Sequence, residues 1–114
     1  NGIRAVVPEV SIPFRPSAPG DEDCRVCAGL SGAYGGLPAD EVKAVFDRYN
    51  RTIAELASRH GALFVSTERS FPADDRYYHD SVHFSPDGSL RMGALLAAAI
   101  EPLVNEGIVG GTRP

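Results

Sequence analysis

Apolar residues occur in this chain as two short continuous runs and two longer periodic segments. The run from Ile3 to Val7 ends at Pro8, and a second run spans Ala62 to Ser66. Continuous apolar runs of this length are typical of parallel strands that are covered on both faces. The pattern therefore predicts two short buried strands joined through a helix, the crossover unit that is right-handed in nearly all proteins.

The first periodic segment predicts a long amphipathic helix after Pro38. Proline is favoured in a first helical turn, and the acids Asp40 and Glu41 suit the positive end of the helix dipole. Gly61 is placed to end the helix, because glycine adopts the left-handed conformation found there. One face carries the apolar residues Val42, Val45, Phe46, Tyr49, Ile53, Leu56 and Ala57, and the other carries Lys43, Asp47, Arg48, Arg51 and Glu55.

The second periodic segment predicts a final helix. Ser85 is a suitable N-cap, with Pro86 in the first turn and Asp87 close behind. Pro102 lacks a backbone donor and is expected to kink or end this helix, and residues 106–114 are expected to form a flexible tail. The predicted buried face consists of Leu90, Ala94, Leu95, Ala98 and Leu103.

A long loop insertion is predicted over residues 11–37, which are rich in proline, glycine, serine and acids. Structureless connections longer than about 12 to 15 residues are uncommon in compact domains and are often functional or mobile. A cleft rim and a tolerated surface insertion both fit this composition. Two strands and two long helices would leave apolar faces uncovered, so we expect another segment or a second chain to complete the sheet.

The composition narrows the functional classes. The chain has 114 residues, of which 43% are hydrophobic and 23% charged, as in an ordinary soluble globular domain. Its net charge is −4 and its 11 basic residues are scattered, so nucleic acid is not an expected partner. No apolar run reaches the roughly 18 residues that a membrane span requires.

Cys24 and Cys27 are the two cysteines of the chain, too few for a disulfide framework or a four-ligand zinc site. The acids at 21–23 disfavour the thiolate that a redox-active Cys-x-x-Cys motif needs. A local disulfide is the favoured interpretation over free thiols or a shared metal site. If Cys24 and Cys27 form a disulfide, a secreted or periplasmic location is indicated.

Asp80 and His83 are the candidate catalytic residues. In acyl transfer a neutral imidazole takes the proton of a serine hydroxyl and later returns it, and a carboxylate on its other nitrogen fixes the ring. An acid three positions before a histidine, just ahead of a capped helix, allows one turn to set this pair. The alternative is that Asp80 only turns the backbone and His83 is an ordinary exposed histidine.

Three neighbouring features bear on this interpretation. His79 could serve as the base, although adjacent residues of an extended loop point apart, which favours a solvent or cleft-wall position. Ser81 is a poor nucleophile candidate, because one tight turn would not let His83 reach its oxygen, and backbone capping is expected instead. Tyr77 and Tyr78 could line a substrate pocket or pack beneath the loop.

The segment from Tyr77 to Gly88 resembles the last block of the SGNH, or GDSL-type, serine hydrolases, with its Asp-x-x-His-hydrophobic-Ser/Thr-x-x-Gly pattern. The order of elements is similar over most of Ile3 to Val104. The resemblance implies a three-layer α/β/α fold with a parallel, flavodoxin-like sheet, of which residues 1–114 would be the carboxyl-terminal half. It also implies ester hydrolysis, with His83 as base, Asp80 as orienting acid, a small-molecule ester as substrate, and no metal or organic cofactor.

The family's other blocks do not occur in this sequence. Its nucleophile lies in a Gly-Asp-Ser motif, whereas Gly20-Asp21 is followed by Glu22, and Asn1 lies too close to the first strand to be the oxyanion-hole asparagine. We therefore expect an amino-terminal half, in the same precursor or in a second chain, to supply the serine, and the chain alone to be inactive. A noncatalytic interaction or assembly module that retains half of the fold is the alternative.

Overall fold

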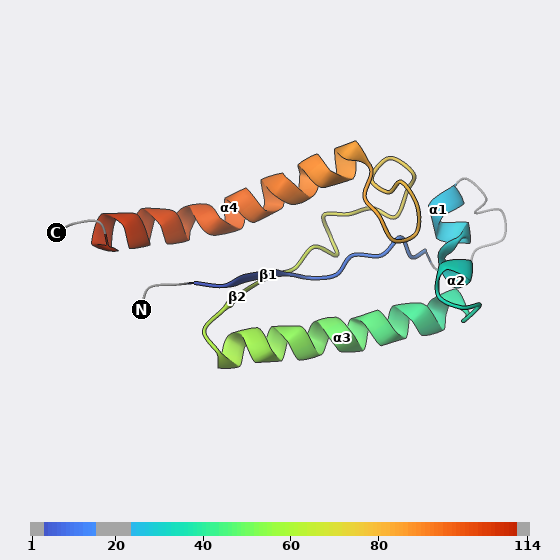
Figure 1. The fold of residues 1–114 in the computed structure, drawn as a ribbon, viewed down its shortest axis with the longest axis horizontal. Coiled ribbons are helices and arrows are strands. Elements are labelled where there is room, and N and C mark those ends of the chain that lie inside the picture. Colours follow the sequence, from blue (N-terminus) through green and yellow to red (C-terminus); the bar gives the residue numbers. More distant parts are fainter. Residues whose placement is uncertain (1–3, 16–23, 112–114) are drawn as a thin grey trace.

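The computed structural model describes residues 4–15 and 24–111, with side chains as far as Glu106, and shows a mixed α/β architecture. Two strands lie between two long helices, α3 and α4, while two single-turn helices lie at one end of the molecule (Figure 1). The elements in chain order are β1 (Val6–Pro8), α1 (Arg25–Ala28), α2 (Leu30–Ala33), α3 (Ala39–Arg59), β2 (Leu63–Val65) and α4 (Pro86–Gly111).

The predicted parallel pairing of the two strands is confirmed. Val6 pairs with Leu63 and Pro8 with Val65, and α3 is the connection between the strands. The first strand begins at Val6 and includes Pro8, whereas the sequence had predicted Ile3 to Val7; Ile3 lies outside the described residues. Proline has no backbone N–H to donate to a strand ladder. Pro8 is tolerated because the hydrogen bond at this end of the ladder comes from the next residue, Glu9, whose N–H donates to the carbonyl of Val65 at 2.8 Å.

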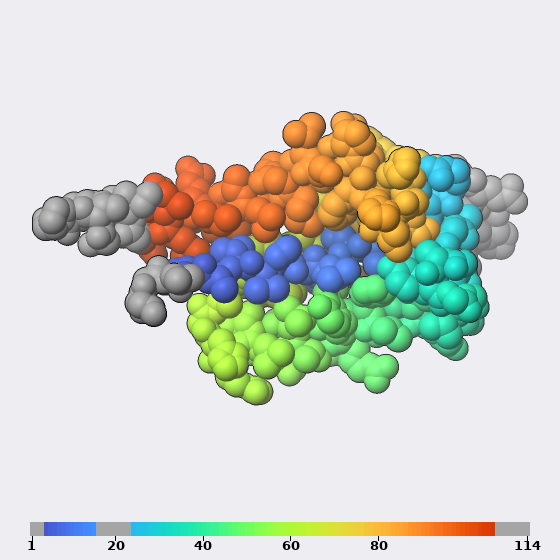
Figure 2. Space-filling view, in the orientation of Figure 1, coloured from blue at the N-terminus to red at the C-terminus, as the bar shows by residue number. Residues whose placement is uncertain are grey.

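The expectation that both strands are covered on both faces is wrong for β1. Val6 and Val7 are half-buried and Pro8 is exposed. Within the described part of the chain, β1 pairs with β2 alone, so its other edge is open. Figure 2 shows this segment at the surface between α3 and α4. The described residues therefore leave this apolar strand partly uncovered.

Helix α3 is the predicted amphipathic helix. It starts one residue later than expected, with Pro38 as its N-cap, and Gly61 just beyond its end has the left-handed φ of 72°. Much of the predicted buried face is nevertheless open to solvent: Val45 is 49%, Tyr49 51% and Leu56 40% exposed. Within the described ranges, several apolar side chains on this helix therefore lack a neighbour to cover them.

Helix α4 begins as predicted, because the Ser85 hydroxyl accepts the N–H of Gly88 at 3.0 Å. The helix continues past Pro102 to Gly111, so Pro102 does not end it; residues 106–111 of the expected tail are helical, and 112–114 are not described. The predicted buried face is wrong at three positions, Leu90, Ala94 and Ala98, which are exposed. Among the described helices, none has the length and apolar character needed to cross a membrane.

The predicted loop over residues 11–37 contains α1 and α2, so it is partly helical; residues 16–23 of it lie outside the described part. Its α1 end takes part in the hydrophobic core, which gathers around Cys24, Val26, Phe71, Tyr77 and Tyr78. Met92 and Leu95 of α4 pack against this core. The core thus lies under the segment that contains Asp80 and His83.

Candidate active site

The segment from Tyr77 to Ser85 is a narrow hairpin-like loop. Tyr78 and Phe84 form an antiparallel bridge, and the His79 N–H donates to the carbonyl of His83 at 2.9 Å. One step further out, the Ser85 N–H donates to the carbonyl of Tyr77 at 3.1 Å. The backbone therefore closes on itself around the four residues that carry the candidate chemistry.

Aromatic packing anchors both ends of this loop. The Tyr78 and Phe84 rings lie 5.5 Å apart, and Phe84 stacks on Phe71 at 4.9 Å between ring centres. Tyr77 and Tyr78 are buried beneath the loop, as one of the two alternatives for this pair predicted. The loop is therefore fixed from below by the core while its tip faces outward.

Asp80 both turns the backbone and holds the imidazole. Its Oδ1 accepts the N–H of Val82 at 2.8 Å and that of His83 at 2.7 Å. The Nδ1 atom of His83 lies 3.0 Å from each carboxylate oxygen of Asp80. The two interpretations of the sequence are therefore compatible, since one carboxylate does both.

These hydrogen bonds favour the charged carboxylate. The Val82 backbone N–H, and then the His83 side chain, lower the pKa of Asp80 below its ordinary value. Asp80 is therefore ionised at neutral pH. A negative carboxylate on Nδ1 selects the tautomer with a proton on that nitrogen and leaves Nε2 as the basic atom.

The other side of the imidazole is open. The His83 side chain is 71% exposed and that of Asp80 44% exposed. Within the described part of the chain, no hydrogen bond reaches Nε2 of His83. The nitrogen that would act as base is thus free to meet a hydroxyl brought from elsewhere.

The neighbouring serines are occupied by structural contacts. The buried Ser81 hydroxyl donates to the carbonyl of Val26 in α1 at 2.9 Å, in line with the capping role expected for it. Ser85 donates to the carbonyl of Arg76 and caps α4. Neither serine is available as a nucleophile for His83.

His79 has no carboxylate on its ring among the described residues, and the hydrogen bonds it makes with them come from its backbone. Its carbonyl accepts a hydrogen bond from the Arg25 guanidinium at 3.0 Å. The acid therefore orients His83 rather than His79, as the spacing had predicted.

A cavity of about 380 Å³ lies where β1 and β2 end, beside the first half of α3. Asp80 and His83 are not part of its lining. Buried Tyr78 is part of the lining, whereas Tyr77 is not, and a role of the tyrosine pair in a substrate pocket stays a prediction. The lining residues are Glu9, Val10, Ser11, Ile12, Phe14, Lys43, Phe46, Asp47, Asn50, Glu68, Phe71, Pro72, Ala73 and Tyr78.

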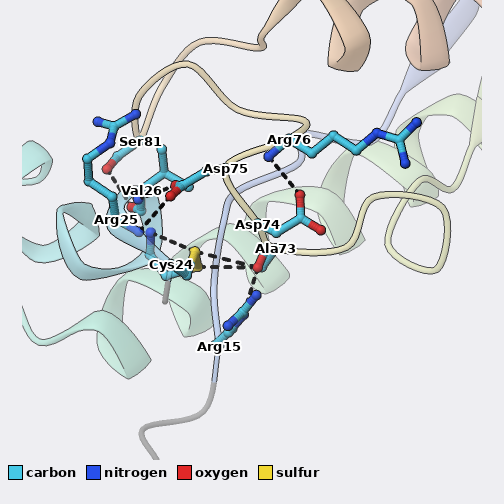
Figure 3. Close-up of a disulfide and its surroundings, with 10 residues drawn as sticks. Arg15, Cys24, Arg25, Val26, Ala73, Asp74, Asp75, Arg76 and Ser81 are labelled. Atoms are coloured by element: carbon cyan, nitrogen blue, oxygen red, sulfur yellow. Dashed lines mark hydrogen bonds between the residues drawn. A yellow bond between two sulfur atoms is a disulfide. The ribbon is translucent and has the colours of Figure 1, made fainter. Parts of the chain in front are cut away.

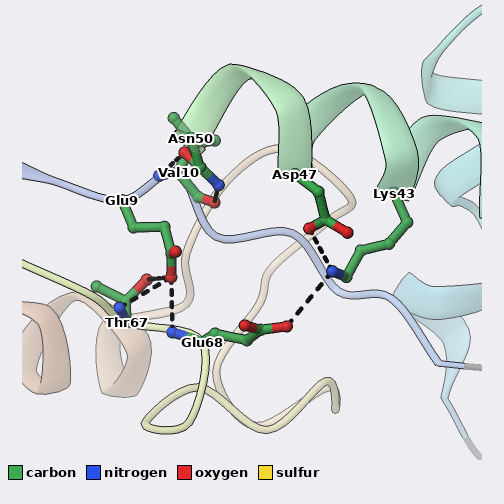
Figure 4. A network of polar contacts seen from close by, with 7 residues as sticks. All are labelled: Glu9, Val10, Lys43, Asp47, Asn50, Thr67 and Glu68. Atoms are coloured by element: carbon green, nitrogen blue, oxygen red, sulfur yellow. Dashed lines mark hydrogen bonds and ion pairs between the residues drawn. The ribbon is translucent and has the colours of Figure 1, made fainter. Parts of the chain in front are cut away.

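Most polar groups around this cavity satisfy one another (Figure 4), whereas the Tyr78 hydroxyl lacks a well-formed hydrogen bond among the described residues. Oε1 of Glu9 accepts the backbone N–H groups of Thr67 at 3.0 Å and Glu68 at 2.8 Å. Asn50 bonds both backbone groups of Val10 at 2.9 Å. Sequence reasoning missed these roles, because their partners lie 40 or more positions away along the chain.

The charge of Lys43 is balanced by two carboxylates. Its ammonium group pairs with Asp47 and lies 3.4 Å from Glu68, so Lys43 does not bring an unpaired positive charge to this cavity. No cluster of three His, Cys, Asp or Glu side chains suited to a metal ion occurs within the residues that the structure describes. The cavity network is therefore best understood as a structural link between α3 and the two strand ends.

Cys24 and Cys27 form a disulfide across α1, the favoured alternative for this pair, with their Cα atoms 5.2 Å apart. Both sulfur atoms lie within 3.5 Å of the Ala73 carbonyl oxygen (Figure 3). The bridge thus lies against the segment that leads into the Asp80 loop. It belongs to the surroundings of the candidate site.

The geometry places a carboxylate on one ring nitrogen of His83 and, among the residues that the structure describes, no serine at the other nitrogen. A hydroxyl approaching Nε2 of His83 would complete the constellation. Comparisons of this chain with protein-family models, with curated proteins and with solved structures found no match.

Proposed function

We propose that this chain supplies the acid and the base of a serine ester hydrolase of the SGNH type. The observation that supports the proposal is the contact of His83 Nδ1 with both oxygens of Asp80, combined with an exposed ring whose Nε2 has no partner in the described part of the chain. His83 is the general base and acid, and Asp80 orients it and stabilises the imidazolium.

The chemistry follows from these roles. Nε2 of His83 takes the serine proton as the serine oxygen attacks the ester carbonyl, and it then protonates the alcohol whose bond to the acyl carbon breaks. Water repeats the two steps and releases the acid. Esters of lipids, acetylated sugars and small alcohols are all substrates that this reaction accommodates, so the proposal specifies carboxylic esters as a class.

The proposal requires an amino-terminal half of a three-layer α/β/α fold. The open edge of β1 supports this requirement, because a parallel strand on that side would extend the sheet between α3 and α4. Exposed apolar side chains on the two helices, including Tyr49 and Leu90, would then gain cover. That half would bring the serine and the oxyanion hole, either in the same precursor or as a second chain.

The compartment forms part of the same proposal. The Cys24–Cys27 disulfide supports a secreted or periplasmic protein, because such bonds persist where the environment is oxidising. Alkylation mass spectrometry of protein from its native compartment tests this point: unreacted cysteines that become reactive after reduction are expected. Free thiols in that sample would count against an oxidising location.

Labelling with a fluorophosphonate tests the catalytic role. In the whole assembly we expect label on a serine outside residues 1–114, and loss of label in His83→Ala, since removing the base costs several orders of magnitude in rate. The matched control is His60→Ala, an exposed histidine after α3. Equal labelling of His83→Ala and wild type would refute the proposal.

A noncatalytic assembly module is the second candidate, and the open edge of β1 favours it as well. The two candidates differ in one outcome. The module binds its partner in both wild type and His83→Ala, and no serine of the complex reacts with the fluorophosphonate.

A further inference from the structure

We propose that the turn formed by residues 24–29, closed by the Cys24–Cys27 disulfide, is a platform that fixes the Asp80–His83 loop, with Arg25 and Ser81 as positioning residues. The effect on catalysis rests on the proposed hydrolase function. The effect on the loop itself does not, and the two are measured separately below.

Contacts from the platform reach the residues on both sides of Asp80. The Arg25 guanidinium donates to the carbonyl of His79 at 3.0 Å, and the Ser81 hydroxyl donates to the carbonyl of Val26 at 2.9 Å. The residue before the acid and the residue after it are therefore each tied to α1. Asp80 is thereby held from two directions while its carboxylate points to His83.

A third contact joins the platform to the approach of the loop. The two carboxylate oxygens of Asp75 accept the backbone N–H groups of Arg25 at 3.1 Å and Val26 at 2.9 Å (Figure 3). Asp75 thus caps α1 from about 50 positions away along the chain. Two segments distant in sequence are joined by side chain to backbone bonds in both directions.

The platform depends on the disulfide because α1 has only four residues. Such a short helix is marginal on its own, since helix nucleation fixes several dihedrals for few hydrogen bonds. The bridge spans this turn and holds Arg25 and Val26 between its two ends. It therefore preserves the direction in which both residues face the loop.

The burial of Cys24 indicates a structural bridge rather than a redox catalyst. Cys24 is 0% exposed and belongs to the core, whereas an attacking thiol in a catalytic Cys-x-x-Cys motif has to be accessible. The remaining space is also small: a Cβ placed on Gly29 would lie 3.1 Å from the Ser81 hydroxyl oxygen. Ser81 therefore fits closely against the platform.

The first test compares Arg25→Ala with Arg25→Lys by hydrogen exchange of residues 77–85 in the intact protein. Arg25 is exposed, so folding is not at risk, and lysine retains a donor for the His79 carbonyl. We expect exchange of the His79 amide to rise about threefold in Arg25→Ala and to return toward wild type in Arg25→Lys. The matched control, Arg48→Ala on α3, should leave it unchanged. Equal exchange in all four proteins would overturn the role of Arg25.

The second test removes the bridge. Dithiothreitol gives two electrons and two protons to the Cys24–Cys27 disulfide, which yields two thiols and the cyclic disulfide of the reagent. We expect faster exchange of residues 77–85 after reduction, and no further response to dithiothreitol in the Cys24→Ala/Cys27→Ala variant. Unchanged exchange on reduction would overturn the role of the disulfide.

The catalytic consequence has its own measurement. In the active assembly we expect Ser81→Ala and Arg25→Ala to lower kcat about tenfold with KM nearly constant, because a misdirected base affects the reaction step more than binding. Ser58→Ala, an exposed serine of α3, is the control for Ser81. Altered exchange with no reactive serine in any assembly would retain the platform and reject the hydrolase; normal kcat in both variants would reject the positioning role of Arg25 and Ser81 in catalysis.

Discussion

Gly88 lies directly against the backbone of Tyr77: a Cβ on Gly88 would stand 2.0 Å from the Tyr77 carbonyl oxygen. That carbonyl also accepts the Ser85 N–H that closes the Asp80–His83 loop. The glycine of the Asp-x-x-His-hydrophobic-Ser-x-x-Gly pattern therefore has a steric reason, because only glycine lets the first turn of α4 approach the base of the loop.

Gly88→Ala is expected to destabilise the protein by about 2 to 4 kcal/mol, because backbone atoms, which cannot step aside as a flexible side chain does, occupy the space. Urea unfolding measures this. Gly93→Ala in the same helix is the matched control, since nothing lies within 4 Å of its added methyl group. That variant should gain up to about 1 kcal/mol from helix propensity. Equal effects of the two variants would contradict the close contact at Gly88.

Asp80→Asn is expected to lower kcat by about 10³- to 10⁴-fold in the active assembly. The amide can still accept the Val82 N–H, but it lacks the charge that stabilises an imidazolium and selects its tautomer. Steady-state kinetics measures the change, and Asp40→Asn at the exposed start of α3 serves as control. A kcat within threefold of wild type would reject Asp80 as the orienting acid.

Acid is expected to weaken the contact between Asp75 and α1. The backbone N–H groups of Val26 and Arg25 lower the pKa of Asp75 below its ordinary value of 3.8. A carboxylate with a lowered folded-state pKa stabilises the fold above the unfolded-state pKa, and the contribution is lost as the pH falls through the folded-state value. Urea midpoints of wild type and Asp75→Asn should therefore differ at pH 6 and converge below pH 3.8. A constant difference across this range would contradict the assignment.

Tyr78→Phe is expected to leave stability unchanged or to raise it by up to about 1 kcal/mol. The Tyr78 hydroxyl is buried without a well-formed hydrogen bond among the described residues, where only the Ser11 side chain interacts with it, so its removal relieves a desolvation cost. Burial also raises the pKa of this tyrosine. Thermal unfolding measures the effect, with Tyr49→Phe on exposed α3 as control. A loss above 1 kcal/mol would show that the hydroxyl has a partner.

Local sequence patterns predicted where helices and strands form better than they predicted which side chains are buried. The capping residues Ser85 and Gly61 follow from interactions close in sequence, and they were found where expected. The parallel pair of strands joins residues 57 positions apart, and it was predicted from the order of strand, helix and strand along the chain. Which helical face is buried depends instead on what packs there. Periodicity predicts that Leu90 lies on the buried face of α4, but Leu90 is 74% exposed. Helix α4 is apolar on more than one side, so the periodic pattern does not single out the face that packs.

The candidate site likewise contains contacts that the local sequence predicts and contacts that it does not. The contact between Asp80 and His83 was predictable, since three positions and one turn determine it. The bonds of Ser81 to Val26 and of Asp75 to α1 were not, because their partners lie 49 to 55 positions apart. A loop of mixed polar residues carries no periodic signal that would indicate such pairings.

The unpaired edge of β1 has a practical consequence for handling the protein. A free strand offers a row of backbone donors and acceptors to any extended peptide, and nearby apolar helix surface adds attraction that is indifferent to the partner's sequence. The chain on its own should therefore form concentration-dependent oligomers through this edge, which sedimentation would detect. If the proposed amino-terminal half exists, co-expression with it should suppress these oligomers and give a single species.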